Sequence, residues 1–279
     1  MQYARPVELK QALELLANGK WDILAGGTDF YPALGENAPK SDILDITSIA
    51  TLNGVTEKLD HWRIGALTTW ADIAALDLPD CFNALKQAAI EVGSKQIQNR
   101  ATIAGNLCNA SPAADGVPAL LVLDAEIELM GKNGTRQLPL SEFISGNRQT
   151  SLASDELLSA IIIPRMSATG NSAFHKLGSR RYMVISIVMT AVRLLKGPLG
   201  EVMTASVSVG ACSAVAQRLP ELEQKLIAQP FDKSLCDLIS ADQFSHLTPI
   251  NDIRAPADYR QSAMQESVRR AILSAVEAQ

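Results

Sequence analysis

Residues 101–131 read ATIAGNLCNASPAADGVPALLVLDAEIELMG and contain neither lysine nor arginine. Small residues and hydroxyl groups gather near the start, at Thr102, Ala104 and Gly105. Further on, apolar residues alternate with charged ones, and the pair Asn133-Gly134 that follows is a strong hairpin-turn signal. The stretch therefore predicts a tight bend that leads into a β-hairpin.

A second stretch, residues 21–39, has the same composition and again no basic residue. Its apolar start, WDIL, predicts a short strand over residues 21–24, and AGGTD at 25–29 follows directly. Gly26 and Gly27 supply backbone conformations that other residues rarely adopt. The sequence therefore predicts a second tight bend, at the end of this strand.

The two bends have two interpretations. They are either ordinary tight turns or a pair of backbone cradles for an anionic ligand. Successive N–H groups in such turns form concave anion sites, and the missing side chains let a ligand approach the main chain. Each hydrogen bond to a charged oxygen contributes ~1.5–3 kcal/mol, so several together hold a pyrophosphate without a lysine. A dinucleotide-like ligand that is partly an uncharged ring system suits this design.

Outside the bends the pattern predicts an α+β protein. A helix is expected after Pro6, with Leu9, Ala12, Leu13 and Leu16 on one face. Asp80 is expected to cap a second helix that stops at Gly93. Strands are also expected at residues 43–46, 62–66, 157–163, 174–177, 184–195 and 202–209, and further helices at 220–227 and 257–276.

A domain boundary is expected near residue 168, where the small and polar sequence SATGNS resembles a linker. The first domain, residues 1–168, is expected to contain two α/β subdomains divided near residue 55. The second, residues 169–279, is expected to form a three-stranded antiparallel sheet with helices.

Composition excludes several classes of protein. The 279 residues are 47% hydrophobic and 20% charged, which excludes a disordered chain. The formal net charge of −5 argues against nucleic-acid binding. No signal peptide and no membrane-spanning apolar run is visible, so a cytoplasmic protein is expected. The four cysteines show no CxxC spacing, so neither a metal site nor a disulfide is expected.

The common catalytic signatures are missing as well. The sequence contains no GxGxxG after a strand, no phosphate-binding P-loop, no HExxH and no GxSxG. The three histidines are far apart in the sequence and are interpreted as surface or packing residues. We therefore expect no catalytic residue in this chain.

Two residues near the second bend carry separate expectations. Asp115 either caps the apolar run 117–123 or accepts a hydrogen bond from a ribose hydroxyl beside a pyrophosphate. Cys108 is expected to be a small buried residue, because nothing basic lies near it in the sequence to activate its thiol.

Four segments together resemble one known family. AGGTDF (25–30), KQIQNRATIAGNLCNASPAAD (95–115), AFHKLGSRR (173–181) and NDIRAPADYR (251–260) are similar to the FAD-binding subunits of the molybdenum-containing hydroxylases. This group includes xanthine dehydrogenase, carbon monoxide dehydrogenase, nicotinate dehydrogenase and quinoline oxidoreductase. The block around TIAGN is the most diagnostic, and the four segments span nearly the whole chain.

The resemblance implies a fold and a set of FAD-binding residues. The fold is a two-lobed FAD-binding domain of the vanillyl-alcohol-oxidase type, followed by the three-stranded sheet with helices. The two bends hold the FAD pyrophosphate, Asp115 lies near the ribose, and Asp29 and Phe30 lie against the isoalloxazine ring, with Tyr182 a weaker candidate. Leu158 and Lys176 fall where the family places residues near the adenine and the flavin. The full implied set is Ile23, Leu24, Ala25, Gly26, Gly27, Thr28, Asp29, Phe30, Thr102, Ile103, Ala104, Gly105, Asn106, Asp115, Leu158 and Lys176.

This sequence departs from the family pattern at three positions. Ala104 stands where glycine is usual, which brings a methyl group close to the phosphates. Gln98 replaces a frequent arginine. Val92 occupies a position that is aromatic in the eukaryotic enzyme, which puts stacking on the flavin there in doubt.

The resemblance also implies partners and a role. FAD on this chain receives electrons from [2Fe–2S] clusters on a small subunit, which are reduced by a molybdenum cofactor on a large subunit, in a dimer of heterotrimers. The electrons then leave to NAD⁺, O₂ or a quinone. Two alternatives remain open: a self-sufficient FAD-dependent oxidoreductase of the same fold, and a flavin-free scaffold that only holds other subunits together.

Overall fold

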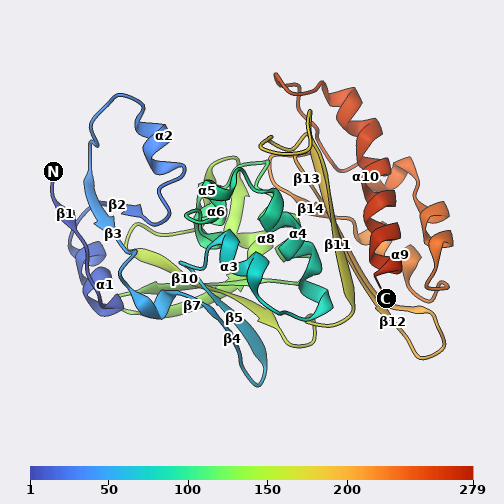
Figure 1. The fold of residues 1–279 in the computed structure, drawn as a ribbon, viewed down its shortest axis with the longest axis horizontal. Coiled ribbons are helices and arrows are strands. Elements are labelled where there is room, and N and C mark those ends of the chain that lie inside the picture. The colour runs from blue at the N-terminus through green and yellow to red at the C-terminus, as the bar shows by residue number, and fades with distance from the viewer. Residues whose placement is uncertain (279) are drawn as a thin grey trace.

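The computed structural model describes residues 1–278 and has the predicted α+β class, with three main sheets and helices packed on them (Figure 1). The N-terminal lobe, in blue, and the C-terminal helices, in red, lie at opposite ends of the molecule, with the middle of the chain between them. Within residues 1–278, none of the helices is long and apolar enough to cross a membrane.

The N-terminal lobe is a small parallel sheet with strand order β1-β3-β2. Its elements are β1 (Tyr3–Ala4), α1 (Leu9–Asn18), β2 (Trp21–Leu24), α2 (Phe30–Leu34) and β3 (Asp42–Asp45). Helix α1 buries Ala12, Leu13 and Leu16, which confirms the apolar stripe expected after Pro6. The first bend joins β2 to α2 and so lies at the carboxyl end of a parallel strand.

The middle of the chain forms a five-stranded antiparallel sheet with order β4-β5-β10-β6-β7. The central strand β10 is the most apolar and is buried along most of its length. Its strands are β4 (Val55–Glu57), β5 (His61–Gly65), β6 (Glu126–Gly131), β7 (Gly134–Pro139) and β10 (Glu156–Pro164). Strands β6 and β7 form the hairpin that Asn133-Gly134 predicts.

Helices cover this sheet and connect it to the rest of the molecule. They are α3 (Trp70–Ala75), α4 (Asn83–Glu91), α5 (Lys95–Gln98), α6 (Ile103–Asn109), α7 (Gly116–Leu121) and α8 (Leu140–Phe143). A two-stranded ribbon, β8 (Ile144–Gly146) with β9 (Gln149–Thr150), and two short 3-10 turns, Ala50–Leu52 and Asp80–Phe82, complete this part. The second bend lies at the start of α6.

The C-terminal part is an antiparallel sheet of order β11-β12-β13-β14. Helix α10 packs against β11 and β12, while α4 packs against β11 and α7 against β12 and β13. The elements are β11 (Asn171–Leu177), β12 (Val188–Lys196), β13 (Val202–Gly210), β14 (Gln217–Arg218), α9 (Pro220–Leu226), α10 (Ala257–Glu277) and 3-10 turns Lys233–Leu238 and Ala241–Phe244. The fourth strand, which has only two residues, adds to the three expected from the sequence.

Two local predictions are wrong. The strand expected from residue 184 begins at Val188, because residues 178–187 form an irregular connection that is exposed up to residue 185 and buried at Ser186 and Ile187. Asp80 does not cap α4: it opens the 3-10 turn, and Phe82 precedes the helix without a side-chain capping bond. In both places tertiary packing, rather than local sequence preference, decides where the element begins.

Candidate functional site

The two bends are in direct contact through the backbone of Gly26. A Cβ atom at this position would lie 2.1 Å from the carbonyl oxygen of Arg100 and 2.9 Å from the Cα of Ala101. Any side chain at residue 26 would therefore push the bends apart. Gly27 has φ +77°, a left-handed conformation that favours glycine. The tight-turn requirement and the close approach of the two bends are thus satisfied by the same glycine pair.

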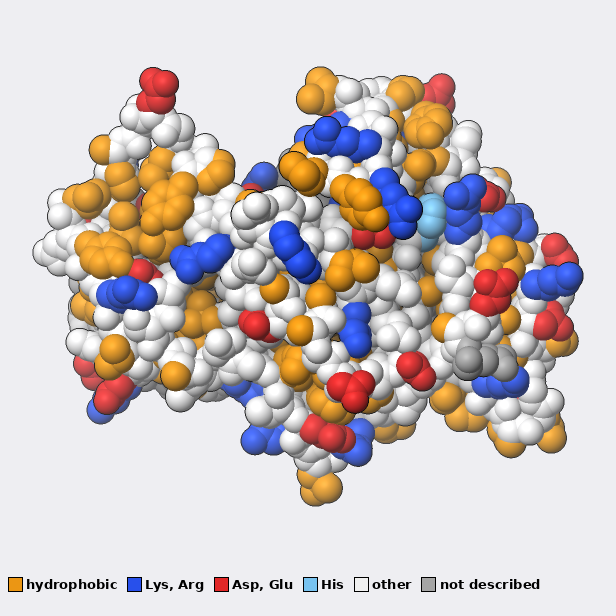
Figure 2. All heavy atoms as spheres, in the orientation of Figure 1, with side chains coloured by type: hydrophobic (Ala, Val, Ile, Leu, Met, Phe, Trp, Pro, Cys, Tyr) orange, Lys and Arg blue, Asp and Glu red, His pale blue; other side chains and the backbone are white. Residues whose placement is uncertain are grey.

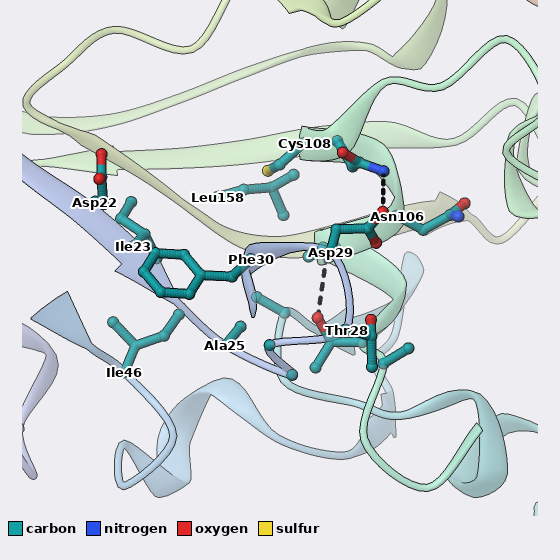
Figure 3. A pocket seen from close by; sticks show the side chains of 18 of the residues that line it. Asp22, Ile23, Ala25, Thr28, Asp29, Phe30, Ile46, Asn106, Cys108 and Leu158 are labelled. Carbon is teal, nitrogen blue, oxygen red and sulfur yellow. Dashed lines mark hydrogen bonds between the residues drawn. The ribbon is translucent and has the colours of Figure 1, made fainter. Parts of the chain in front are cut away.

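A cleft of about 690 Å³ opens beside this contact and is lined by residues of both bends. The surface is hollowed between the N-terminal lobe and the rest of the molecule (Figure 2). Figure 3 shows Phe30 with Ile23 and Ile46 at one end, and Cys108 of α6 beside Leu158 of β10. The volume lies within the range typical of small-molecule and cofactor sites.

The cleft brings together most of the residues expected to hold a ligand. Those that line it are Ile23, Ala25, Gly26, Gly27, Thr28, Asp29, Phe30, Thr102, Ala104, Gly105, Asn106 and Leu158. Four others do not line it: Leu24 and Ile103 point into the core, and Asp115 and Lys176 are buried behind the wall. Tyr182, on the exposed 178–187 connection, is not a lining residue either.

Sequence reasoning missed one wall of the cleft. Leu152, Ala153 and Ser154, in the connection between β9 and β10, line it, and so does Trp70 at the start of α3. These four residues belong to no recognisable sequence motif. The only available signal was the small and uncharged run SLAS at residues 151–154, directly before the central strand.

The second bend is held by hydrogen bonds on both sides. The amide of Ile103 donates to the carbonyl of Thr68 over 3.0 Å, and the amide of Trp70 donates to the carbonyl of Ala101 over 3.1 Å. Thr102 caps α6, because its hydroxyl accepts from the amide of Gly105 over 3.0 Å. The amides of Ile103 and Gly105 are thus paired within the protein, and in the first turn of α6 the amide of Ala104 is the one left for a ligand.

Several polar groups of the cleft wall have no partner within the described residues, 1–278. The amides of Gly26, Gly27, Thr28 and Ala104 donate to no other protein group there. The Oδ1 atom of Asn106 is buried and likewise has no hydrogen-bond partner in that part of the chain. The unpaired amides fit a ligand that accepts hydrogen bonds, and a buried acceptor such as Asn106 Oδ1 is normally paired as well. The residues present therefore fit the diphosphate and hydroxyl groups of FAD.

The electrostatics of the cleft are unusual for a site that binds phosphate. Its lining in the described chain contains no lysine or arginine, and its acidic side chains are Asp22, Asp29 and Glu156. Asp29 accepts a hydrogen bond from Asn109 of α6 over 2.9 Å, which ties the two bends together a second time. Glu156 is paired with Arg136, which lowers the pKa of this carboxyl. The described lining therefore offers an anion main-chain N–H groups and no cationic side chain.

Cys108 differs from the expectation of a small buried residue. It is exposed within the cleft, while Cys81, Cys212 and Cys236 are buried. The pocket walls around the thiol desolvate it and raise its pKa to about 12. Residue 108 lies one turn beyond Ala104 in α6, and both residues line the cleft. The lack of a basic neighbour in the sequence gives no information on this position.

Asp115 and Lys176 are paired with each other behind the cleft. The Lys176 ammonium donates to Asp115 Oδ2 over 2.6 Å and to the carbonyl of Glu91 over 3.2 Å. Ser186 donates to Asp115 Oδ1 over 2.5 Å. Burial raises the pKa of Asp115, and its bonds to Lys176 and Ser186 oppose that rise. Asp115 precedes α7, but its side chain makes no capping bond to this helix.

Two family models together match most of the chain. A family model described as the FAD binding domain in molybdopterin dehydrogenase matches residues 1–166. A second, described as the CO dehydrogenase flavoprotein C-terminal domain, matches residues 172–275. The two matches cover both the cleft and the C-terminal sheet.

Individual relatives agree with the family models. The nicotinate dehydrogenase FAD-subunit of Eubacterium barkeri is 33% identical over 82% of this chain and 80% of its own. The putative xanthine dehydrogenase FAD-binding subunit of Escherichia coli K12 is 32% identical over 99% of this chain and 96% of its own. A structure of reconstituted CO dehydrogenase from Oligotropha carboxidovorans superposes with a TM-score of 0.91 at 26% identity, over 99% of this chain and 97% of that one. The chain therefore belongs to the family of FAD-binding subunits of the molybdenum hydroxylases.

Proposed function

We propose that the cleft holds FAD, with its diphosphate between the two bends. The observation that carries the proposal is the contact of Gly26 with the backbone at Arg100, which places unpaired amides of both bends around one cavity. The amides of Gly27, Thr28 and Ala104 would donate to the diphosphate oxygens, and Asn106 would accept from a hydroxyl. Donors fixed in the backbone need no reorganisation when the ligand binds.

The side chains at the ends of the cleft would orient the rest of the cofactor. Phe30 and Leu158 offer apolar surface for a ring, in keeping with the family positions that they match. Ala104 stands in place of the usual glycine, and its methyl group narrows the cleft without closing it, because the residue still lines the cleft. The carboxylate of Asp115 is held by Lys176 and Ser186 behind the cleft wall. Asp115 would therefore influence the ribose site without contacting the ribose directly.

We infer that the chain is the electron-exit subunit of a molybdenum hydroxylase complex. FAD supplies the redox chemistry, by accepting electrons from one donor and releasing them to another. Its electrons would come from [2Fe–2S] clusters on a small subunit, which a molybdenum cofactor on a large subunit reduces. An external acceptor, NAD⁺, O₂ or a quinone, would then take them. This chain's own residues bind and orient the cofactor and restrict water around it.

The proposed architecture follows the same family. The N-terminal lobe and the five-stranded sheet would correspond to the two lobes of the vanillyl-alcohol-oxidase type, divided near residue 55, with FAD between them. The domain boundary is placed near residue 168, and the C-terminal sheet with its helices would complete the subunit. A dimer of heterotrimers is the proposed assembly.

The test is to purify the full chain alone and together with the chains that co-purify with it. We expect the lone chain to bind one FAD, measured by its visible absorbance, and to oxidise no hydroxylase substrate. The complex is expected to contain molybdenum and iron by metal analysis and to reduce the flavin when substrate is added. Substrate turnover by the lone flavoprotein would refute the subunit assignment, and a colourless chain that takes up no added FAD would refute the cleft assignment.

A further inference from the structure

We propose that Asp115, Lys176 and Ser186 are positioning residues that fasten the β11–β12 connection, residues 178–187, to the back of the FAD cleft. This inference rests on the proposed function, because it assigns a role at the same site. The three residues come from the turn before α7, from β11 and from the end of the connection itself. They therefore join the first domain to the second.

The contact is fully enclosed in protein. The side chain of Lys176 is 3% exposed and that of Asp115 is 9% exposed. The two oxygens of Asp115 are divided between its partners, one accepting from Lys176 and the other from Ser186. An ion pair removed from water is stable only when its remaining polar atoms are also satisfied, and Ser186 satisfies the second oxygen. Loss of this hydroxyl therefore weakens the whole contact.

Each end of the contact adjoins a residue of the cleft wall. Lys176 donates to the carbonyl of Glu91, and the next residue, Val92, lines the cleft. Asp115 precedes Gly116, where a Cβ atom would lie 3.0 Å from the buried and unpaired Oδ1 of Asn106, a residue that lines the cleft. The pair thus lies directly behind two walls of the cleft, which fits a positioning role better than direct contact with the cofactor.

The connection that Ser186 fastens is mostly exposed up to residue 185, whereas Ile187 is buried, its amide donates to the carbonyl of Leu177 over 2.8 Å and its carbonyl accepts from Arg260 of α10. Tyr182, Met183 and Ile185 are each at least 50% exposed. Within residues 178–187, all of which the structure describes, Ser186 supplies the side-chain hydrogen bond that reaches the first domain, whereas Arg180 bonds only to the carbonyl of Met183 in the same connection. The shape of the cleft wall and the position of this exposed segment are therefore linked through one hydroxyl.

This link predicts reciprocal coupling between FAD and the connection. If bound FAD stabilises the walls at Val92 and Asn106, it also stabilises the fastened connection. Loss of the fastening then weakens FAD binding by the same factor by which FAD stabilises the fastening. Trypsin reports the connection directly, because Arg180 and Arg181 are exposed within it. Lys132, at the exposed turn of the β6–β7 hairpin, provides a reference cut in the same chain.

The experiment measures tryptic cleavage after Arg180 and Arg181, relative to cleavage after Lys132, by mass spectrometry on the full chain with and without FAD. For Ser186→Ala we expect the apo ratio to rise on the order of tenfold, as for a lost hydrogen bond to a charged group. FAD should protect the connection in the wild type and protect it several-fold less in the variant. Ser186→Thr, which keeps the hydroxyl, should restore the wild-type ratio.

Ser208→Ala is the matched control, because Ser208 is buried on β13 and bonds only to the carbonyl of Gln217. Its cleavage ratio should equal that of the wild type. An unchanged apo ratio in Ser186→Ala would overturn the fastening, and equal protection by FAD in both chains would overturn the coupling. A wild-type chain that binds no FAD would instead refute the proposed function, while the apo ratios would still decide the fastening.

Discussion

Arg193 of β12 donates from Nε to the carbonyl of Val122 over 2.6 Å, across the boundary between the FAD-binding part and the C-terminal sheet. The same guanidinium contacts Asp124 at 3.2 Å and donates to Ser206 over 3.1 Å, and its side chain is 3% exposed. Burial lowers the pKa of Arg193, and the facing carboxylate of Asp124 opposes that effect. One side chain thus satisfies polar groups on both sides of the boundary.

Arg193→Met is therefore expected to lower the free energy of unfolding. Loss of the guanidinium leaves the buried carbonyl of Val122 without its hydrogen-bond donor, which costs about 1–3 kcal/mol. Urea unfolding followed by circular dichroism measures this change. Lys225→Met is the control, since Lys225 and Asp242 form an exposed pair at 3.6 Å, and it should change stability by less than about 0.5 kcal/mol. Equal effects of the two substitutions would show that Arg193 does not hold the boundary.

Gly26→Ala tests the contact between the bends. Its methyl group would overlap the carbonyl oxygen of Arg100, so the bends must separate and the amide cradle must open. Overpacking of this kind costs about 1–3 kcal/mol, which corresponds to a roughly ten- to hundredfold weaker FAD affinity if the strain is relieved by opening the cleft. Quenching of flavin fluorescence on titration measures it.

The control for that substitution is Gly131→Ala at the end of β6. A methyl group there meets its nearest neighbour at 3.5 Å, an ordinary van der Waals distance. FAD affinity should equal that of the wild type in this variant. Unaltered affinity in Gly26→Ala would mean that the two bends do not hold the diphosphate jointly.

Cys108 gives a direct probe of cofactor occupancy. It is the exposed thiol of the chain and lies in the cleft, whereas the other three cysteines are buried. Because its raised pKa slows alkylation, we expect a small mercurial to serve better. One thiol should react rapidly in the apo chain, FAD should slow it at least about tenfold, and Cys108→Ser should abolish the rapid phase. Reaction at the same rate with and without FAD would place the cofactor elsewhere.

Asp252 predicts a loss of stability in acid. Burial alone would raise its pKa, but the amides of Arg254 and Ala255 and the guanidinium of Arg260 lower it to about 2. A carboxyl whose pKa is lower in the folded chain stabilises the fold above its unfolded pKa, and this contribution is lost as pH falls from about 4 to about 2. Melting temperatures at pH 5, 4, 3 and 2 for the wild type and Asp252→Asn measure it.

The two chains should differ most at pH 5 and converge towards pH 2, because asparagine has no proton to gain. A constant difference across this range would show that ionisation of Asp252 does not contribute to stability.

The elements near the cleft were readable from sequence because their signals are local. Trp21–Leu24 followed by two glycines predicts a strand and a turn, and the apolar spacing after Pro6 predicts α1 without reference to the rest of the fold. Residues 184–187, VISI, have strand-like composition but lie outside β12, and the buried Ser186 donates to Asp115, 71 residues earlier in the chain. No local pattern encodes that partner.

The same limit applies to the site itself. Asp115 and Lys176 are expected beside the cofactor from the sequence, and the structure pairs them with each other across the predicted boundary near residue 168. Leu152 and Ala153 line the cleft only because β10 lies at the centre of the sheet and brings the preceding connection beside the first bend. Such neighbours follow from sheet order, which one sequence does not reveal.

The proposed binding surface, made from the amides of Gly27, Thr28 and Ala104, has a consequence for mutagenesis. Alanine scanning removes side chains and leaves these donors in place, so a conventional scan would underestimate their contribution to the free energy of ligand binding. Replacing one of these peptide bonds with an ester, which deletes a single donor and keeps the side chain, would reveal it.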